Sequence, residues 1–323
     1  MRTVCARLLL IALLVAAALC GRAVAAPAAP SGRLVTRSGQ AMGTAVQMQV
    51  YVPAAQDEAP VVAAIDAAFA ELRRLERLMT TWRDDSDISR VNAAAGTTAV
   101  PVAPEVFDVV RRSQEFSRLS RGAFDISFYA LRGLWRFDED LTPALPDPKL
   151  LAERRRLIDY RSIVLDDKAR TIRLARPGMA INLGGIGKGY AVDAAVRVLR
   201  DLGLRNGMVQ AGGDLMLFGS KAGQPFVAGI RDPRGPAGNY FAVCPVRDHA
   251  FSTAGDYERG FVKDGVRYHH ILDPRTGYPA AGARSVTVYA RDATTADGLD
   301  DAVLILGPER GLQVIEDTPD AGA

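Results

Sequence analysis

Apolar residues recur at intervals of three and four in two stretches of the N-terminal half. The stretch 61–78 keeps this spacing throughout, and a second stretch begins after Pro104 and ends at Gly122. Such spacing places apolar side chains on one face of an α-helix, and glycine often follows a helix end. The two stretches therefore predict amphipathic helices that pack one face against a core.

Shorter segments with alternating or continuous apolar residues predict strands. Segment 44–52 alternates apolar and polar residues, and 163–165 and 171–174 flank a polar turn, as in a β-hairpin. The remaining predicted strands are 180–183, 208–211, 226–230, 240–244 and 285–289, and two closing helices are predicted at 295–306 and 308–315. Strands and helices come in mixed order without strict alternation, so the predicted fold class is α+β.

The N-terminus has a different pattern. Arg2 and Arg7 precede the apolar run 8–19, and the small residues Ala23 and Ala25 follow it. A positive region, a short apolar run and an A-x-A site are typical of a secretory signal peptide, and the run is too short to span a bilayer comfortably. We therefore expect export to the periplasm.

Three segments follow from this pattern: a signal peptide at 1–25, a flexible Ala/Pro/Ser-rich tether at 26–38 and one domain at 39–323. Lipidation of Cys20 is an alternative route, although the bulky Leu19 before it is unusual for a lipoprotein signal. Anchoring to a membrane is expected only if Cys20 is lipidated.

Net charge and cysteine content exclude some classes of function and of covalent cross-link. The formal charge of +3 is carried by Arg2, Arg7 and Arg22, so residues 26–323 are neutral. A neutral chain lacks the basic surface of a nucleic-acid binder, and nucleic acid is therefore not an expected partner. Cys244 is the single cysteine beyond the predicted leader, which excludes an intramolecular disulfide after cleavage.

A glycine-rich turn at 184–189 lies between a predicted strand and a predicted helix. Backbone N–H groups at a helix N-terminus favour phosphate, and Lys188 adds a positive charge. The turn is not a Walker A loop, since Asn182 occupies the first glycine position and Gly189 the hydroxyl position. Tight packing of strand against helix explains the same glycines, and this alternative stays open.

Asp297 and Asp301 are four residues apart on a predicted helix and share one face. Two adjacent carboxylates repel each other unless a cation lies between them, and oxygen ligands suit Mg²⁺. Asp300 adds a third acidic side chain nearby. A solvated acidic helix face explains the spacing equally well.

Histidines and aromatic residues supply further candidates. His269 and His270 precede a Pro/Gly turn at 273–279, and histidine moves protons near neutral pH. Trp82 and Phe124 have rings that can stack on a planar ligand. The alternatives to these functional roles are that the two histidines only pack in a tight turn and that the two aromatic residues belong to the core.

Eight short segments, taken together and in this order, resemble the ApbE-type family of FAD:protein FMN transferases. They span residues 40–316, nearly the whole predicted mature chain. They are Ala-Met-Gly-Thr at 41–44, Thr-Thr-Trp at 80–82 with Asp-Ser-Asp at 85–87 and Asn92, Gly-Ala-Phe-Asp at 122–125, Asn-Leu-Gly-Gly-Ile-Gly-Lys-Gly-Tyr at 182–190, Ala-Gly-Gly-Asp at 211–214, Gly-Asp-Tyr at 255–257, 270–279 and 296–307.

The resemblance implies one α+β unit of two lobes with FAD in the cleft between them. It implies Mg²⁺-dependent cleavage of the FAD pyrophosphate, with FMN passing to a threonine hydroxyl of an acceptor protein and AMP released. The implied acceptors are threonine-bearing flavoproteins of membrane redox complexes. An FAD pyrophosphatase and a non-enzymatic periplasmic flavin-binding protein are the two rival functions.

The resemblance also implies roles for individual residues. His270 and Asp297 are the implied catalytic residues, and His270 would handle a proton. The implied metal ligands are the carbonyl of Gly185 and the carboxylates of Asp297 and Asp301. The implied FAD contacts are Met42, Trp82, Ala123, Phe124, Asp125, Asn182, Lys188 and Ile271.

The chain departs from the family pattern in four places. Asp301 stands where threonine is usual, which adds a carboxylate to the implied metal site. Asn182 replaces a common aspartate, and Ala254 replaces a serine. The C-terminal end is also shorter than usual for the family. The first two changes compensate in charge, so we expect altered rather than absent metal binding.

Overall fold

The computed structural model of the protein describes residues 32–137, 144–236 and 238–323. The predicted signal peptide and the start of the predicted tether lie outside these residues. The rest of the tether prediction is wrong, because Gly32–Ala41 forms strand β1 and pairs along its whole length with β2, Thr44–Pro53. The regular ladder satisfies the backbone hydrogen-bonding groups of this segment, although the weak apolar pattern of 32–41 does not predict a strand.

A six-stranded sheet forms the first lobe, in the order β1-β2-β6-β7-β10-β13 with antiparallel neighbours. Its further strands are β6 Gly207–Ala211, β7 Asp214–Phe218, β10 His249–Gly255 and β13 Ser285–Ala290. The sequence predicted strands in the regions of β2, β6 and β13, which the structure confirms, but not β7 or β10.

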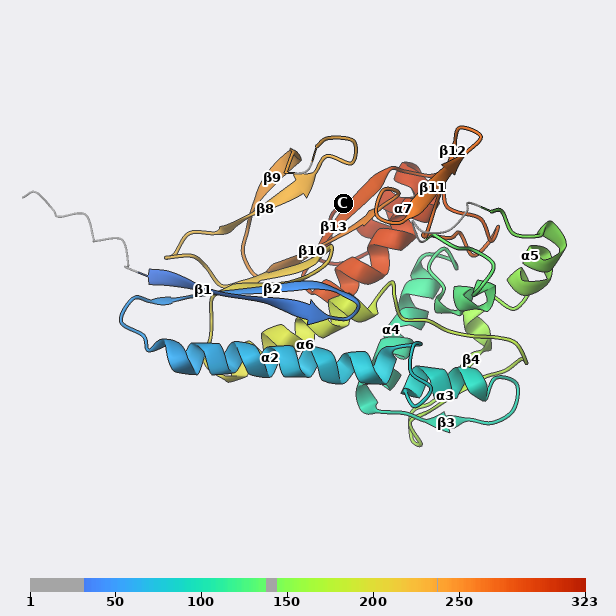
Figure 1. Ribbon diagram of the computed structural model, residues 1–323, viewed down its shortest axis with the longest axis horizontal. Coiled ribbons are helices and arrows are strands. Elements are labelled where there is room, and N and C mark those ends of the chain that lie inside the picture. Colours follow the sequence, from blue (N-terminus) through green and yellow to red (C-terminus); the bar gives the residue numbers. More distant parts are fainter. Residues whose placement is uncertain (1–31, 138–143, 237) are drawn as a thin grey trace, which may run out of the picture.

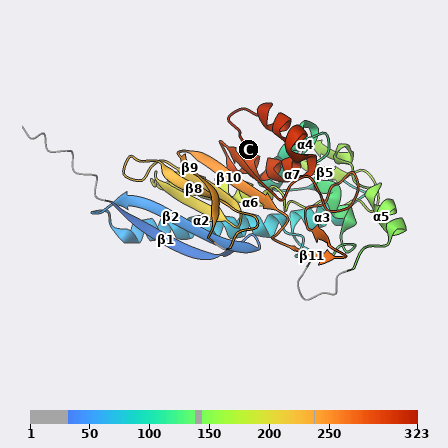
Figure 2. The same cartoon turned by 90° about the horizontal axis from the view of Figure 1, so that it is seen from above.

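Helices α2, α6 and α7 cover one face of this sheet, so the core lies between the two layers (Figures 1 and 2). They span Glu58–Met79, Gly187–Asp201 and Ala293–Glu316. Helix α7 is interrupted at Gly307, which has a φ of 76° and is followed by Pro308. This break agrees with the two closing helices that the sequence predicted.

The second lobe lies beside the first along the long axis of the molecule (Figure 1). Its helical elements are α3 Asp87–Ala93, α4 Pro104–Leu119, η1 Ile126–Leu131, α5 Pro148–Arg155 and η2 Tyr160–Ser162. Its small sheet contains β3 Val100–Pro101, β4 Ile163–Asp166 and β5 Thr171–Leu174, which confirms the predicted hairpin.

The predicted strand at 180–183 does not form. The side chain of Asn92 takes the place of a neighbouring strand, since its Oδ1 accepts from the Ile181 N–H at 2.7 Å and its Nδ2 donates to the Ile181 carbonyl at 3.0 Å. Because these groups are already satisfied, the apolar run enters the glycine-rich turn without joining a sheet.

Two further hairpins complete the fold: β8 Phe226–Arg231 with β9 Tyr240–Val246, and β11 Gly260–Lys263 with β12 Val266–His269. Helices and antiparallel strands are thus mixed in one two-lobed unit, and the predicted α+β class is confirmed. No helix in the described part of the chain combines the length and apolar character needed to cross a bilayer.

Candidate active site

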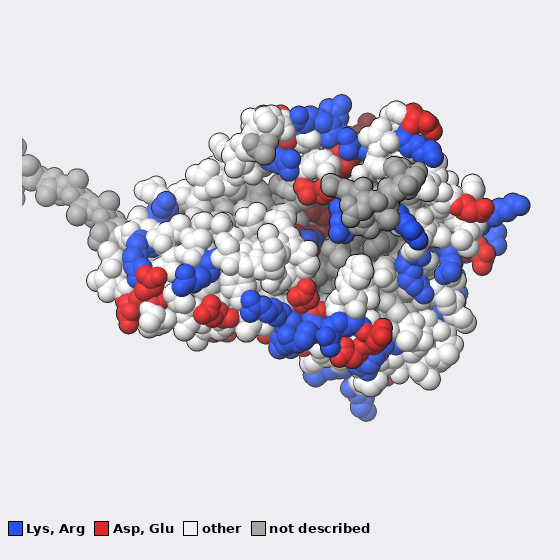
Figure 3. Space-filling model, viewed as in Figure 1, with Lys and Arg blue, Asp and Glu red and all other residues white. Residues whose placement is uncertain are grey.

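A cavity of about 1550 Å³ opens between the end of the sheet and the second lobe. Figure 3 shows it as a hollow in the middle of one face, with acidic atoms visible inside. Small-molecule sites commonly measure roughly 300–1,000 Å³, so the space accommodates a dinucleotide. Its lining includes every residue for which the resemblance implies a site role: Met42, Trp82, Ala123, Phe124, Asp125, Asn182, Gly185, Lys188, His270, Ile271, Asp297 and Asp301.

The glycine-rich turn brings the backbone of α6 directly against α7. A Cβ atom at Gly189 would lie 2.2 Å from the carbonyl oxygen of Ala293, so a larger residue does not fit there. The Gly189 N–H donates to Oδ2 of Asp297 at 2.8 Å. Tight packing therefore does explain one of these glycines, and the same packing aims the Asp297 carboxylate.

Asn182 holds the start of the turn. Its Oδ1 accepts from the Gly184 N–H at 2.7 Å, and its Nδ2 donates to Thr81 Oγ1 at 3.3 Å. The asparagine thus ties the turn to the segment after α2. This contact keeps the Gly184–Gly185 backbone in the cavity wall.

Lys188 extends from α6 into a group of acids. Its Nζ lies 3.1 Å from Asp214 Oδ2 and 3.3 Å from Asp297 Oδ1, and it donates to the Gly184 carbonyl at 3.2 Å. Burial disfavours the charged amine, but the carboxylates of Asp214 and Asp297 outweigh this effect and raise the pKa of Lys188 well above its usual value. The cavity therefore holds a constant positive charge.

Three buried carboxyl groups, those of Asp214, Asp297 and Asp300, place oxygen atoms within 4.8 Å of one another. Ser252 Oγ lies 2.6 Å from Asp214 Oδ1 and 2.6 Å from Asp300 Oδ2. The Ser252 hydroxyl donates to these two carboxyl groups and so links Asp214 of β7 to Asp300 of α7. Burial and the charges of Asp301, Asp297 and Asp214 raise the pKa of Asp300 well above its usual value.

The acids that face the glycine-rich turn have raised pKa values as well. Burial and the charge of Asp214 raise the pKa of Asp297 to about 7, and burial raises the pKa of Asp301 to about 6. A Cβ atom at Gly185 would be 2.9 Å from Asp301 Oδ2, so glycine lets this carboxylate reach the loop backbone.

The donor set fits the implied Mg²⁺. Carboxylate and carbonyl oxygens are the ligands that this ion prefers, and a cation would offset the repulsion among these buried acids. Gly185, Asp297 and Asp301 all line the cavity, whereas the carboxyl oxygens that lie within 4.8 Å of one another are those of Asp214, Asp297 and Asp300. Their role as metal ligands stays a prediction.

His270 lies on the cavity wall. Its Nδ1 is 3.4 Å from the Arg259 carbonyl, which only accepts, so Nδ1 carries the hydrogen and Nε2 keeps a free lone pair. Desolvation lowers the pKa of His270 although the side chain keeps access to solvent, and the ring is neutral at pH 7. His269 instead is buried and contacts the Ala280 carbonyl through Nε2, which confirms the packed-imidazole alternative for this residue.

The two candidate aromatic residues differ sharply. Trp82 is 93% exposed at the cavity edge and is free to stack on a ligand ring, so it is not a core residue. Phe124 is buried and makes an edge contact with Phe116, with ring centroids 6.2 Å apart. Phe124 therefore has a packing role, whatever its contact with a ligand.

Asp125 also makes hydrogen bonds that stabilise the second lobe. Its Oδ1 accepts from the backbone and hydroxyl of Ser127 at 2.8 and 2.6 Å, and its Oδ2 accepts from the Tyr160 N–H at 2.9 Å. The carboxylate thus caps η1 and fixes the segment before β4. Its predicted contact with FAD stays a prediction.

Sequence reasoning assigned no role to Asp214 or Ser252. Asp214 follows Gly212-Gly213 and begins β7, so the double glycine directly before an acid was an available signal. Ser252 lies within β10, a strand whose small and polar residues do not alternate, and the chain carried no signal for it. Pairing of β7 with β10 brings the two residues together, and the packing of α6 and α7 on the sheet brings Lys188 to Asp214 and Asp300 to Ser252.

An antiparallel sheet backed by helices, with a large cavity where a partly exposed lysine meets clustered buried acids, defines a protein suited to an anionic, phosphate-bearing ligand and a divalent cation. Comparison with known proteins narrows this class. A family model described as the ApbE family matches residues 42–323. The chain belongs to the ApbE family, which confirms the resemblance found in its sequence.

Relatives and solved structures agree with this assignment. A FAD:protein FMN transferase of Treponema pallidum is 35% identical over 306 residues, covering 90% of this chain and 84% of the relative. One from Klebsiella pneumoniae is 31% identical, with 90% and 84% covered. The crystal structure of the ApbE protein from Thermotoga maritima matches with a TM-score of 0.80 and 33% identity over 89% of this chain and 91% of that one. Flavin transferase ApbE from Vibrio cholerae matches at 0.78 and 29%, over 90% and 96%.

Proposed function

We propose that this protein transfers FMN from FAD to a threonine hydroxyl of an acceptor protein and releases AMP, in a Mg²⁺-dependent reaction. The observation that carries the proposal is the meeting of Lys188, Asp297 and Asp301 in one dinucleotide-sized cavity. The names of the similar proteins, FAD:protein FMN transferases, support the same activity.

Cleavage of a pyrophosphate depends mainly on neutralising charge and aligning the reacting atoms. Lys188 keeps its positive charge and lies beside the backbone of the glycine-rich turn, where it would hold the phosphates. Mg²⁺, held by Gly185, Asp297 and Asp301, would supply further neutralisation of phosphate charge when bound. Asp214 and Gly184 keep the lysine amine in place.

The reaction forms a bond between the threonine oxygen and the phosphorus of the FMN half. The bridging bond to the AMP half breaks, and AMP leaves with the bridging oxygen. The threonine proton must pass to a base, and neutral His270 on the cavity wall is the candidate, with its Nε2 lone pair as the acceptor. FAD is the first substrate and the acceptor protein is the second.

The site of action belongs to the same proposal. The leader pattern at 1–25 supports export to the periplasm, where the acceptors would be threonine-bearing flavoproteins of membrane redox complexes. A fractionation experiment with the full-length chain checks this location. Retention of the uncleaved chain in the cytoplasm would contradict it.

The test is to mix the purified protein with FAD, Mg²⁺ and a flavin-free, threonine-bearing acceptor domain of a membrane redox complex. Flavin fluorescence that stays with the denatured acceptor, together with an equal amount of AMP, is the expected result. An acceptor domain whose threonine is changed to valine is the control and should stay unlabelled.

Two outcomes would overturn the transfer proposal. Free FMN and AMP without a labelled acceptor would identify an FAD pyrophosphatase. Intact FAD that remains bound through repeated incubations would identify a flavin-binding protein without enzymatic activity.

A further inference from the structure

The β8–β9 hairpin has two unlike faces. Its inner face packs on the main sheet, where Ala228 and Val246 join Leu217 and Phe251 in a buried apolar cluster. The opposite side exposes large apolar side chains, which we call the outer face: Val227 is 69% exposed, Tyr240 59%, Phe241 79% and Val243 63%.

The register of the hairpin explains why the outer face is continuous. Val227 pairs with Pro245 and Gly229 pairs with Val243, so these positions alternate with the buried Ala228 and its half-buried partner Cys244. The ring of Tyr240 lies over Gly229, since a Cβ atom there would be 2.5 Å from the ring. Exposed apolar groups side by side on one surface commonly mark a place where another molecule binds.

The outer face continues into the cavity. Val227 and Tyr240 belong both to this face and to the cavity lining, which also includes Gly229 beneath the Tyr240 ring, whereas Phe241 and Val243 are not part of the lining. A molecule that covers the outer face therefore also lies at the mouth of the site. The face adjoins the place where a second substrate must enter.

Charged contacts fasten the hairpin to the same rim. Arg234, in the loop after β8, makes a bidentate ion pair with Asp256, with Nη1–Oδ1 and Nη2–Oδ2 distances of 2.8 and 2.6 Å. The guanidinium of Arg231 lies 4.7 Å from the ring centre of Tyr257, a residue of the cavity lining. These contacts hold the outer face in a constant position relative to the site, as a docking surface requires.

We propose that the outer face of the β8–β9 hairpin docks the acceptor protein, through apolar side chains next to the hydroxyl residue that enters the cavity. The inference rests on the proposed transferase function, because that function requires a polypeptide as second substrate. An extended acceptor segment reaches Lys188 only across the cavity mouth, and the outer face forms an apolar part of that mouth. Apolar side chains of the acceptor are the chemistry that this surface recognises.

The test compares the wild-type protein with a Phe241→Ser/Val243→Thr variant. Both residues lie outside the cavity lining, so affinity for FAD, measured by flavin fluorescence, should stay unchanged. The KM for the acceptor domain should rise about tenfold, with kcat at saturating acceptor nearly unchanged. Leu202→Ser is the matched control, since Leu202 is 56% exposed and lies outside the cavity lining, and its KM should match wild type.

Each result separates the two proposals. If the wild-type protein labels no acceptor, the transferase function fails, and direct binding of the acceptor domain still reports on the outer face. If the wild-type protein labels the acceptor and the double variant has the same KM and the same acceptor affinity, the docking proposal is overturned. A wild-type dimer that the double variant converts to monomers, with acceptor KM unchanged, would assign the face to a second copy of the chain instead.

Discussion

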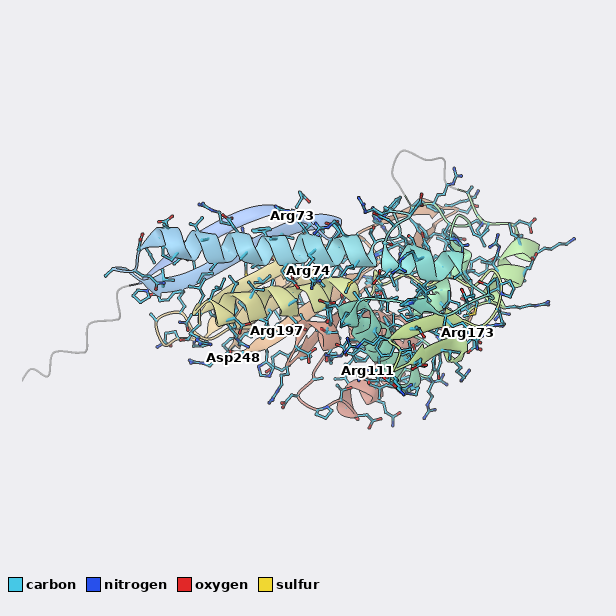
Figure 4. All side chains as sticks on the ribbon, turned by 90° about the horizontal axis from the view of Figure 1, so that it is seen from below. Arg73, Arg74, Arg111, Arg173, Arg197 and Asp248 are labelled. Atoms are coloured by element: carbon cyan, nitrogen blue, oxygen red, sulfur yellow. The ribbon has the colours of Figure 1, made fainter. Side chains whose placement is uncertain are left out.

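The protein carries charged groups in two contrasting regions, the solvent-facing side of helices α2 and α4 and the interior of the cavity. On these helices, Arg74 of α2 and Arg111 of α4 lie toward solvent (Figure 4). Arg74 pairs with Glu71 at 2.7 Å, and Arg111 pairs with Asp108, all with partly exposed side chains. Such exposed pairs contribute about 0–1 kcal/mol each, because water screens both partners.

In the cavity the same kinds of group are removed from water. The side chains of Asp214 and Asp297 are only 1% and 3% exposed, and they contact Lys188. Burial of charge is costly, and removing one partner leaves the others uncompensated. Burial, and not the number of charges, therefore separates the groups of the cavity from those that only keep the surface solvated.

The largest expected effect follows from Asp297→Ala. This change removes a predicted metal ligand and the acceptor of the Gly189 N–H, and it leaves Lys188 with fewer partners. We expect Mg²⁺-dependent turnover to fall by at least about 1,000-fold, measured as flavin attached to the acceptor. Asp108→Ala on the solvent-facing side of α4 is the control, and full activity of Asp297→Ala would remove the metal assignment.

The next effect in size is expected for Lys188→Met, which keeps the length of the side chain and removes its charge. The amine is the cation that faces Asp214 and Asp297, so its loss should lower kcat for FAD cleavage about 100-fold. Single-turnover release of AMP measures this step. A loss below about threefold, similar to that of Arg197→Met on α6, would show that Lys188 does not act on the phosphates.

A smaller effect concerns pH and Mg²⁺. The pKa of Asp297 is raised from 3.8 to about 7, so the folded state binds this proton more tightly than the unfolded state. Its contribution to stability is present below about pH 4 and is lost as the pH rises through 7. Without Mg²⁺, the Tm should therefore fall between pH 5 and pH 8, and added Mg²⁺ should raise it more at pH 8.

Asp297→Asn serves as the control for this pH dependence. The amide does not titrate, so the fall in Tm should become shallower, and the response to Mg²⁺ at pH 8 should shrink. An equal response to Mg²⁺ at both pH values in the wild-type protein would contradict binding by deprotonated carboxylates.

The smallest effect is expected for Arg111→Ala. Its partner Asp108 stays solvated after the change, so the free energy of unfolding should shift by less than about 0.5 kcal/mol and activity should stay at the wild-type level. Urea unfolding followed by circular dichroism measures this shift. A shift above about 2 kcal/mol would break the contrast between the two regions.

Much of the helical structure could be predicted from the sequence, because a helix is specified by local spacing. The stretch 61–78 and the segment after Pro104 correspond to α2 and α4, and the break at Gly307 also came from local residues. The strands were harder to predict from the sequence. The pattern of β10, with Ser252 and Ala254 inside it, has no alternation, since most of its residues are buried between sheet neighbours and α7.

The candidate site divides in the same way. The glycine-rich turn and the Asp297/Asp301 pair each lie within one short segment, so their residue types and spacing already indicated phosphate and metal chemistry. Asp214 and Ser252 lie on separate strands, and only the antiparallel pairing of β7 with β10 brings them together.

By itself, the sequence determined the amphipathic helices, the leader pattern and the segments that identify the family, because each depends on neighbours along the chain. Only the tertiary structure decided which charges are buried, where β1 pairs and how the outer face of the hairpin adjoins the cavity. These properties depend on contacts between distant segments. A carboxylate such as Asp297 acquires its raised pKa from packing against α6 and Asp214, which the order of residues alone does not specify.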